Sequence, residues 1–173
     1  MNIALFNFFF SLSTNPLIAD LSLFISNVFI YILIVLAILI PIFIRRDFIY
    51  SILVFCTGAG AWVMVYIIKN IFMIPRPFVT LHIIPLFMET GFSFPSSHVT
   101  VISALTVLIW NINRKLGIVF LISTILIGIS RMIIGVHYPI DVVAGIFLGV
   151  IIGLCIIWLN KITKQFAFLR KYI

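Results

Sequence analysis

Charged residues are scarce in this sequence. Only 9% of its 173 residues are Asp, Glu, Lys or Arg, whereas 64% are hydrophobic and the mean hydropathy is +1.36. Soluble domains carry about 25% charged residues, so this composition excludes an ordinary soluble domain. We therefore predict an integral membrane protein, in which each cluster of charge needs an explanation.

Basic residues are absent from the N-terminal segment, where no Lys or Arg precedes Arg45. A signal peptide begins with a positively charged stretch, so we expect residues 1–20 to remain on the mature protein. Polar residues and Pro16 interrupt this apolar segment. The pattern predicts a helix lying in the membrane interface, with a sixth span as the alternative.

Cysteine is also rare. Cys56 and Cys155 each lie within an apolar stretch, where a small buried hydrophobic residue is the simplest interpretation. The two residues predict neither a disulfide nor a metal site.

Long apolar stretches dominate the rest of the chain. A membrane-spanning helix needs about 20 mainly apolar residues, and stretches of this kind occur at about 21–43, 48–68, 94–110, 116–134 and 139–159. We predict an all-α integral membrane helical bundle of about five transmembrane helices plus the N-terminal interfacial helix. It forms one domain over residues 1–173, with its motif-bearing core at about 48–160.

Most basic residues gather at one end of the predicted helices. Short cytoplasmic loops collect Lys and Arg, and eight of the eleven basic residues fall in three such places: Arg45, Arg46, Arg114, Lys115, Lys161, Lys164, Arg170 and Lys171. We therefore place these connections and the C-terminus on the cytoplasmic side of an inner or plasma membrane. This topology accounts for the net charge of +7, and a chain without a soluble module predicts no nucleic-acid partner.

Three polar clusters lie at 69–77, 95–98 and 130–141, and the other three basic residues belong to the first and the third of them: Lys69, Arg76 and Arg131. Because successive helices alternate in direction, all three clusters are predicted to meet on the extracytoplasmic face. The one long connection, from about 69 to 94, lies on the same face, and a long loop over a site is usually functional.

Two of the clusters offer donors for a phosphate group. Lys69 supplies an ammonium, and Arg76 supplies a planar fork that can hold two oxygens of a tetrahedral anion. Ser96 and Ser97 introduce a helix whose first N–H groups attract anions, and His98 beside them can protonate a leaving oxygen. Each feature also has a structural explanation, because a lysine at a helix end can snorkel and serines can cap a helix.

The third cluster is the most specific. His137 and Asp141 are four positions apart, which places imidazole and carboxylate on one helix face. A carboxylate bonded to one ring nitrogen fixes the tautomer and leaves the other nitrogen as a nucleophile. The structural alternative is an ion pair between Asp141 and Arg131, but that pair gives His137 no role.

Zinc binding by His98, His137 and Asp141 is a competing interpretation, since two imidazoles and a carboxylate can bind this metal. The neighbouring cations would repel it. His82 and Glu89 match no cluster, and we interpret both as surface residues that touch lipid headgroups.

Small residues form a stripe on the last apolar stretch. Gly145, Gly149 and Gly153 recur every four residues and continue the face begun by Asp141. Such spacing lets helices approach closely. Because the stripe shares a face with Asp141, we predict packing inside the bundle rather than dimerisation.

Taken in order, Lys-x6-Arg-Pro, Pro-Ser-x-His and Ser-Arg-x5-His-x3-Asp resemble the three motifs of the type 2 phosphatidic acid phosphatase superfamily. The likeness covers about 21–159, and the short length and five-span layout are similar to bacterial undecaprenyl-diphosphate phosphatases. One departure is Ser97, where the family usually has glycine; a serine keeps the backbone N–H and adds a hydroxyl.

The resemblance implies a metal-independent lipid phosphatase that uses no cofactor. His137 would form a phosphohistidine, Asp141 would orient it and His98 would protonate the leaving group. The residues expected to hold the phosphoryl oxygens are Lys69, Arg76, Ser96, Ser97 and Arg131. The expected partners are the lipid bilayer and a phosphorylated membrane lipid. Undecaprenyl diphosphate is the first choice of substrate, and phosphatidylglycerol phosphate, phosphatidic acid and lipid A remain open.

A non-catalytic lipid-binding or lipid-moving protein is the alternative from another class. Such a protein needs cations to grip phosphate but has no use for a His137 and Asp141 pair facing His98. The presence of all three residues favours the enzyme.

Overall fold

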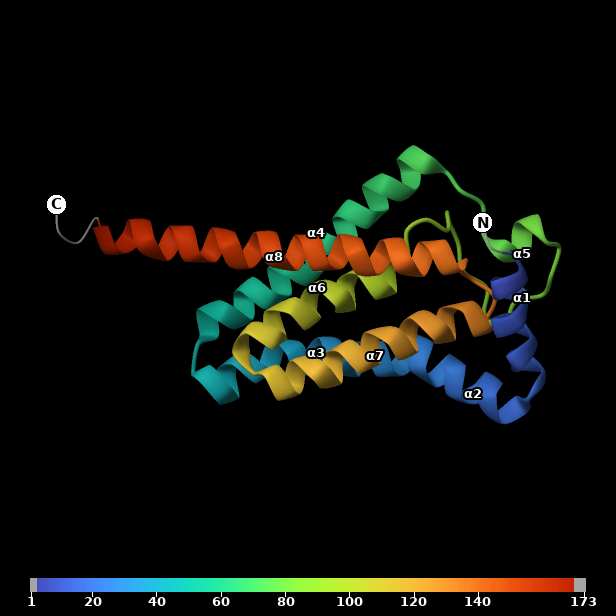
Figure 1. The fold of residues 1–173 in the computed structure, drawn as a ribbon, viewed down its shortest axis with the longest axis horizontal. Coiled ribbons are helices and arrows are strands. Elements are labelled where there is room, and N and C mark those ends of the chain that lie inside the picture. Colours follow the sequence, from blue (N-terminus) through green and yellow to red (C-terminus); the bar gives the residue numbers. More distant parts are fainter. Residues whose placement is uncertain (1–2, 170–173) are drawn as a thin grey trace.

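The computed structural model describes residues 3–169, with side chains up to residue 163, and these residues form helices and loops without a strand. Four of the described helices are long and apolar enough to cross a membrane. They run side by side along the long axis of the molecule (Figure 1). The predicted all-α membrane bundle is thereby confirmed.

The first membrane-spanning helical segment starts earlier than the sequence predicted. It consists of α2 (Pro16–Phe24), η2 (Ile25–Phe29), α3 (Ile30–Ile40) and η3 (Pro41–Arg45). The early start has a local cause: Asn15 accepts a hydrogen bond from the Leu17 N–H at 3.0 Å and caps the helix, and Pro16 occupies the first helical turn, where proline is tolerated. The π-helical turn η2 turns Ser26 inward, where it is fully buried.

The N-terminal segment packs on the protein. Helix α1 (Ile3–Ser11) continues through η1 (Leu12–Thr14), and these twelve residues reach only about 18 Å, too short to cross a bilayer. Phe6 is fully buried, and the centre of its ring lies 5.6 Å from the centre of the Tyr138 ring. The short helix is therefore held against the turn that precedes the last span (Figure 1).

The remaining helices follow the predicted order. They are α4 (Phe48–Phe72), the short α5 (Pro77–Thr80), α6 (Ser97–Ile112), α7 (Arg114–Ile133) and α8 (Pro139–Leu169). Helix α6 has 16 residues, about 24 Å, which is shorter than an ordinary span. It lies at the centre of the bundle and packs on α4, α7 and α8.

The glycine stripe of α8 packs inside the bundle, as predicted. A Cβ added at Gly149 would lie 2.4 Å from the Thr100 carbonyl oxygen of α6, and one at Gly153 would lie 2.7 Å from Val107 Cβ. At Gly145 the nearest atom would be the Ser96 carbonyl oxygen at 3.1 Å. Glycine is therefore what allows α8 and α6 to approach so closely.

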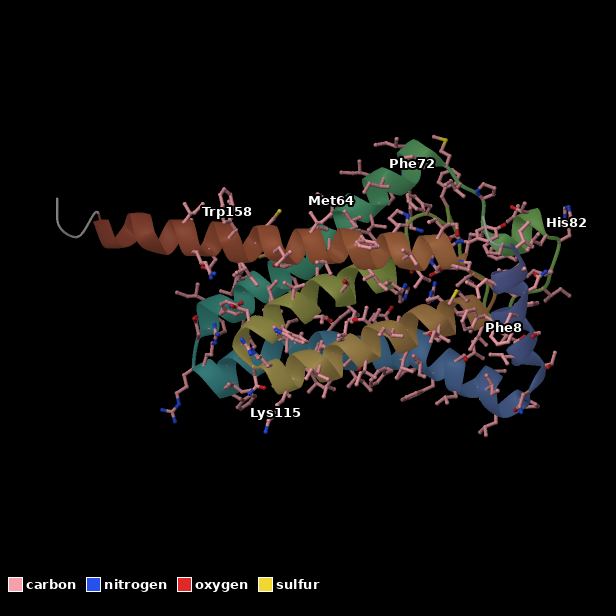
Figure 2. All side chains as sticks on the ribbon, in the orientation of Figure 1. Phe8, Met64, Phe72, His82, Lys115 and Trp158 are labelled. Atoms are coloured by element: carbon pink, nitrogen blue, oxygen red, sulfur yellow. The ribbon has the colours of Figure 1, made fainter. Side chains whose placement is uncertain are left out.

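The two ends of the bundle differ in charge. Lys115 lies at the end opposite the loop that carries His82 (Figure 2). Arg114 precedes it at the start of α7, and Arg45 donates to the Asn111 carbonyl oxygen near the end of α6 at 2.5 Å. Lys164 belongs to α8, whereas Arg170 and Lys171 lie outside the described residues. Cys56 and Cys155 are both exposed on the outer surface of the helices, so their interpretation as buried residues was wrong.

Candidate active site

The three polar clusters meet at the end of the bundle that is opposite the basic end. Lys69 lies in the last turn of α4, Ser96 is the residue before α6, and Arg131 lies in the last turn of α7. His137 comes from the turn between α7 and α8, and Asp141 from the first turn of α8. The predicted convergence of distant segments is thus present in the structure.

A tight turn places His137. Helix α7 ends at Ile133, and Gly135 adopts φ +85°, a left-handed conformation that glycine adopts without strain. The His137 Nδ1 atom then lies 3.3 Å from Asp141 Oδ2, and the imidazole is only 1% exposed. The two groups pair as the sequence indicated, but not on one helix face, because His137 lies in the turn before α8 begins at Pro139.

Asp141 is held by two further donors. Its Oδ2 atom accepts a hydrogen bond from the Tyr138 N–H at 2.8 Å and from Ser93 Oγ at 2.5 Å. Ser93 is fully buried, and sequence reasoning missed it. It lies in an irregular loop, where no periodicity marks an inward side chain. Three donors on one oxygen fix the carboxylate that orients His137.

Arg131 is fully buried and reaches two segments. Its Nη1 donates to Ser26 Oγ at 2.7 Å, and its Nη2 donates to the Glu89 carboxylate. The Nε atom has no hydrogen-bond partner among the described residues. Sequence reasoning also missed Ser26, a single serine in an apolar span. A buried guanidinium with an unused donor is suited to an additional anion.

Arg76 fixes the loop as well as facing the site. Its Nε, Nη1 and Nη2 atoms donate to the carbonyl oxygens of Gly91, Val136 and Thr90 at 3.0–3.1 Å. Nη1 also lies 2.5 Å from Glu89 Oε2. This arginine therefore connects the long loop to the turn that carries His137.

Lys69 has a comparable double role. Its ammonium donates to the carbonyl oxygens of Phe92 and Ser93. An ammonium has three donors, so one remains for a ligand in the pocket that Lys69 lines. This inward contact with the loop argues against simple snorkelling.

Helix α6 begins at the pocket. Ser96 is fully buried, its N–H donates to the Asp141 carbonyl oxygen at 3.1 Å, and its Oγ has no partner. Ser97 and His98 line the pocket. The first N–H groups of a helix have no intrahelical acceptor. These N–H groups and the free hydroxyl of Ser96 add further donors to the site.

The pocket has a volume of about 380 Å³ and opens between α4 and the loop before α6. The polar part of its wall is formed by Lys69, Asn70, Arg76, Glu89, Ser97 and His98. Residues 90–92 of the loop also line it, as do Trp62 and Tyr66 of α4, which are 58% and 60% exposed. The second half of α4, which carries both residues, leans away from the bundle (Figure 1).

Glu89 lies at the centre of the site, so its interpretation as a headgroup-touching surface residue was wrong. Its Oε2 atom contacts both Arg76 and Arg131 and lies 3.9 Å from His137 Nε2. Burial by itself raises the pKa of this carboxyl, but Arg131 and then Arg76 outweigh burial and hold the pKa below its usual range. His82, by contrast, is exposed.

The His137 imidazole is neutral in this environment. Burial, and then the positive charges of Arg131, Lys69 and Arg76, hold the pKa of this imidazole well below its usual value. A neutral ring that donates from Nδ1 to Asp141 has a free lone pair on Nε2. That nitrogen faces the point where the two guanidinium groups meet.

The arrangement suits a tetrahedral anion better than a metal ion. No three His, Cys, Asp or Glu side chains are grouped for metal binding in the part of the chain that the structure describes. The site instead has three cationic side chains, and two buried atoms of its residues, Arg131 Nε and Ser96 Oγ, have no hydrogen-bond partner among the described residues. A phosphoryl group held there would have a nucleophilic nitrogen on one side and His98 in the pocket wall.

Comparison with known proteins identifies the family of the chain. The model of the PAP2 superfamily matches residues 49–164. Undecaprenyl-diphosphatase BcrC of Bacillus subtilis is 35% identical over 114 residues, which are 64% of this chain and 58% of that protein. The match therefore covers less than two thirds of the length of this relative.

Two solved structures share the fold. Aquifex aeolicus LpxE has a TM-score of 0.70 and 25% identity, over 90% of this chain and 94% of that one. A PAP2-type phosphatidylglycerolphosphate phosphatase from Bacillus subtilis has a TM-score of 0.67 and 21% identity, over 86% and 77% of the two chains. The protein is thus a multi-pass membrane protein, and the chain belongs to the PAP2 superfamily, as its three motifs predicted.

Proposed function

We propose that this protein is a metal-independent lipid phosphatase that removes the terminal phosphate of undecaprenyl diphosphate. One observation carries the proposal: the free Nε2 of His137, whose other nitrogen pairs with Asp141 at 3.3 Å, faces the meeting point of Arg76 and Arg131. A nucleophile and two guanidinium groups directed at one point are what phosphoryl transfer requires.

The proposed reaction has two steps. In the resting protein, burial and then Arg131 lower the pKa of His98 to about 3, and the negative charge of a bound phosphate raises it again, so His98 takes up a proton with the substrate. His137 Nε2 attacks phosphorus, the bond from phosphorus to the bridging oxygen breaks, and His98 gives that proton to the leaving undecaprenyl phosphate. Water then attacks the phosphohistidine, His98 takes up a proton from that water, and inorganic phosphate leaves. Asp141 accepts the Nδ1–H bond throughout and stabilises the positive charge that develops on the ring.

The cations supply the stabilisation of the transition state. Charge spreads over the three equatorial oxygens during phosphoryl transfer. Arg131 has an unpaired Nε donor, Ser96 has an unpaired hydroxyl, and Lys69 has a third proton beyond its two carbonyl partners. Donors that are fixed before the reaction lower the barrier because they need no reorganisation.

The position of the pocket supports a lipid substrate. Its α4 wall is formed by Trp62 and Tyr66, both more than half exposed on the lipid-facing side. A headgroup phosphate can therefore enter the pocket while the tail stays in the bilayer. The preference for undecaprenyl diphosphate comes from the similarity to BcrC. Phosphatidylglycerol phosphate, phosphatidic acid and lipid A are the alternative substrates.

The orientation in the membrane is part of the proposal. Arg45, Arg114, Lys115 and Lys161 lie at the end opposite the site, and Lys and Arg collect on the cytoplasmic side. The site then faces away from the cytoplasm of an inner or plasma membrane, and the C-terminus lies in the cytoplasm.

The test is phosphate release by the purified protein in EDTA, from a panel of the four lipids. The turnover rate of the His137→Ala variant should be at least a thousandfold lower than that of wild type. Its size-exclusion elution volume and its thermal unfolding temperature in detergent should be unchanged. His82→Ala is the matched control, because this exposed histidine lies outside the site, and it should behave as wild type. Phosphate-lipid binding without release from any lipid would instead indicate a lipid-binding protein.

A further inference from the structure

Glu89 occupies the place that the proposed function assigns to the substrate phosphate. One carboxylate oxygen, Oε2, lies 2.5 Å from Arg76 Nη1, accepts a hydrogen bond from Arg131 Nη2, and lies 3.9 Å from His137 Nε2. A phosphoryl oxygen bound for attack by His137 would need the same two guanidinium groups. Two anions cannot share this position, because their oxygens would overlap and their charges repel.

The pocket wall points to the same conclusion. Glu89 lines the pocket, whereas His137 and Arg131 are 1% and 0% exposed and do not. The carboxylate therefore separates the open part of the pocket from the nucleophilic nitrogen. A substrate that enters the pocket meets Glu89 before it meets His137.

We propose that Glu89 is an internal anion that fills the phosphoryl subsite of the resting protein and is displaced when a substrate phosphate binds. This inference rests on the proposed function of the same site. Glu89 is thus a residue that sets phosphate affinity, distinct from those that carry out the chemistry.

The loop allows this displacement without moving as a whole. Before Glu89, the Leu86 N–H donates to the Ile134 carbonyl oxygen at 3.0 Å. After it, Thr90 and Gly91 are held through their carbonyl oxygens by Arg76. The Glu89 side chain is 22% exposed between these anchors. Rotation about its own side-chain bonds can therefore carry the carboxylate to the pocket mouth.

Displacement has two effects on ligand binding. The side chains of Arg76 and Arg131 are only 4% and 0% exposed, and in the resting state both stay paired with Glu89. This pairing avoids the free-energy cost of two unpaired buried cations. Every phosphate ligand must replace that pairing, so every phosphate ligand binds more weakly than it would to an empty subsite. A lipid has additional binding energy from its tail, whereas inorganic phosphate has none, and the returning carboxylate helps to expel it.

The experiment measures binding of inorganic phosphate to the purified full chain by isothermal titration calorimetry. Glu89→Gln keeps the size of the side chain and removes its charge, and it should lower the dissociation constant at least tenfold. Glu89→Asp keeps the charge but shortens the reach to the two guanidinium groups, so it should lower the constant by a smaller factor. Asp20→Asn is the matched control, because Asp20 is exposed on α2, and it should leave the constant unchanged.

Equal or weaker phosphate binding by both Glu89 variants would overturn the proposal and make Glu89 a brace for the two arginines. If Glu89→Gln does not fold, the Glu89→Asp result decides by itself. This experiment measures phosphate binding, so its outcome does not depend on whether the protein hydrolyses a lipid. A wild-type protein that hydrolyses lipid while its Glu89 variants bind phosphate no better refutes only this inference. Tighter binding by the variants, without hydrolysis of any lipid by wild type, refutes only the proposed function.

Discussion

Replacing Gly149 with alanine should separate α8 from α6 and disturb the site two turns away. A Cβ at this position would lie 2.4 Å from the Thr100 carbonyl oxygen and 2.6 Å from Ser103 Cβ, whereas real Cβ atoms essentially never approach within 3.0 Å. The backbones must therefore move apart by at least 0.6 Å, the difference between 3.0 and 2.4 Å. Overpacking of this kind costs about 1–3 kcal/mol.

The same movement should reach the catalytic groups. Ser96 at the start of α6 donates its N–H to the Asp141 carbonyl oxygen of α8 at 3.1 Å. This bond fixes the two helices to each other beside His137, and a shift at Gly149 strains it. We expect turnover to fall together with stability, because the orientation of Asp141 depends on the contact between α6 and α8.

The assay is unfolding in mixed micelles with increasing SDS, combined with phosphate release. Gly60→Ala is the matched control, because nothing lies within 4 Å of a Cβ added at Gly60 of α4. Alanine there should leave stability unchanged or raise it by up to about 1 kcal/mol through helix propensity. A Gly149→Ala protein as stable and as active as wild type would refute the argument from close packing.

Two further predictions concern the pair of His137 and Asp141. Ser93→Ala removes one of three donors to Asp141 Oδ2 and should lower kcat about tenfold, since a hydrogen bond to a charged group contributes about 1.5–3 kcal/mol and two donors remain. Ser123→Ala, which removes only a bond to the Val119 carbonyl within α7, is its control, and equal kcat values would contradict the role given to Ser93. Burial and neighbouring cations hold the pKa of His137 well below its usual value, so lowering the pH through 6.5 should leave its ring neutral. Nitrogen-15 NMR of labelled histidine, assigned with His137→Ala, tests this, and protonation near pH 6.5 would contradict it.

The long loop has a role that its sequence does not display. Lys69 and Arg76 each bind backbone carbonyl oxygens of residues 90–93. Both cations therefore hold the loop in place and also line the pocket. Substitution of either residue should affect loop order and phosphate binding together, because one side chain serves both.

Sequence by itself determined the membrane class, the approximate spans and the residues of the three clusters. Apolar runs and basic flanks are local properties. The pairing of His137 with Asp141 is also short-range, although the turn before α8 makes it and not a shared helix face. The convergence of the clusters followed from the alternation of helix direction. These features need no knowledge of which helix packs on which.

Only the tertiary structure decided which other groups complete the site. The partners of Arg131 and Asp141 come from far along the chain: Ser26 is 105 positions from Arg131, and Ser93 is 48 positions from Asp141. Glu89 lies in an irregular loop, where no periodicity tells an inward side chain from an outward one. Helices that are apolar on every side likewise hide their outward face, so the exposure of Cys56 could not be predicted. Packing between distant segments sets these contacts, and a local pattern carries no record of it.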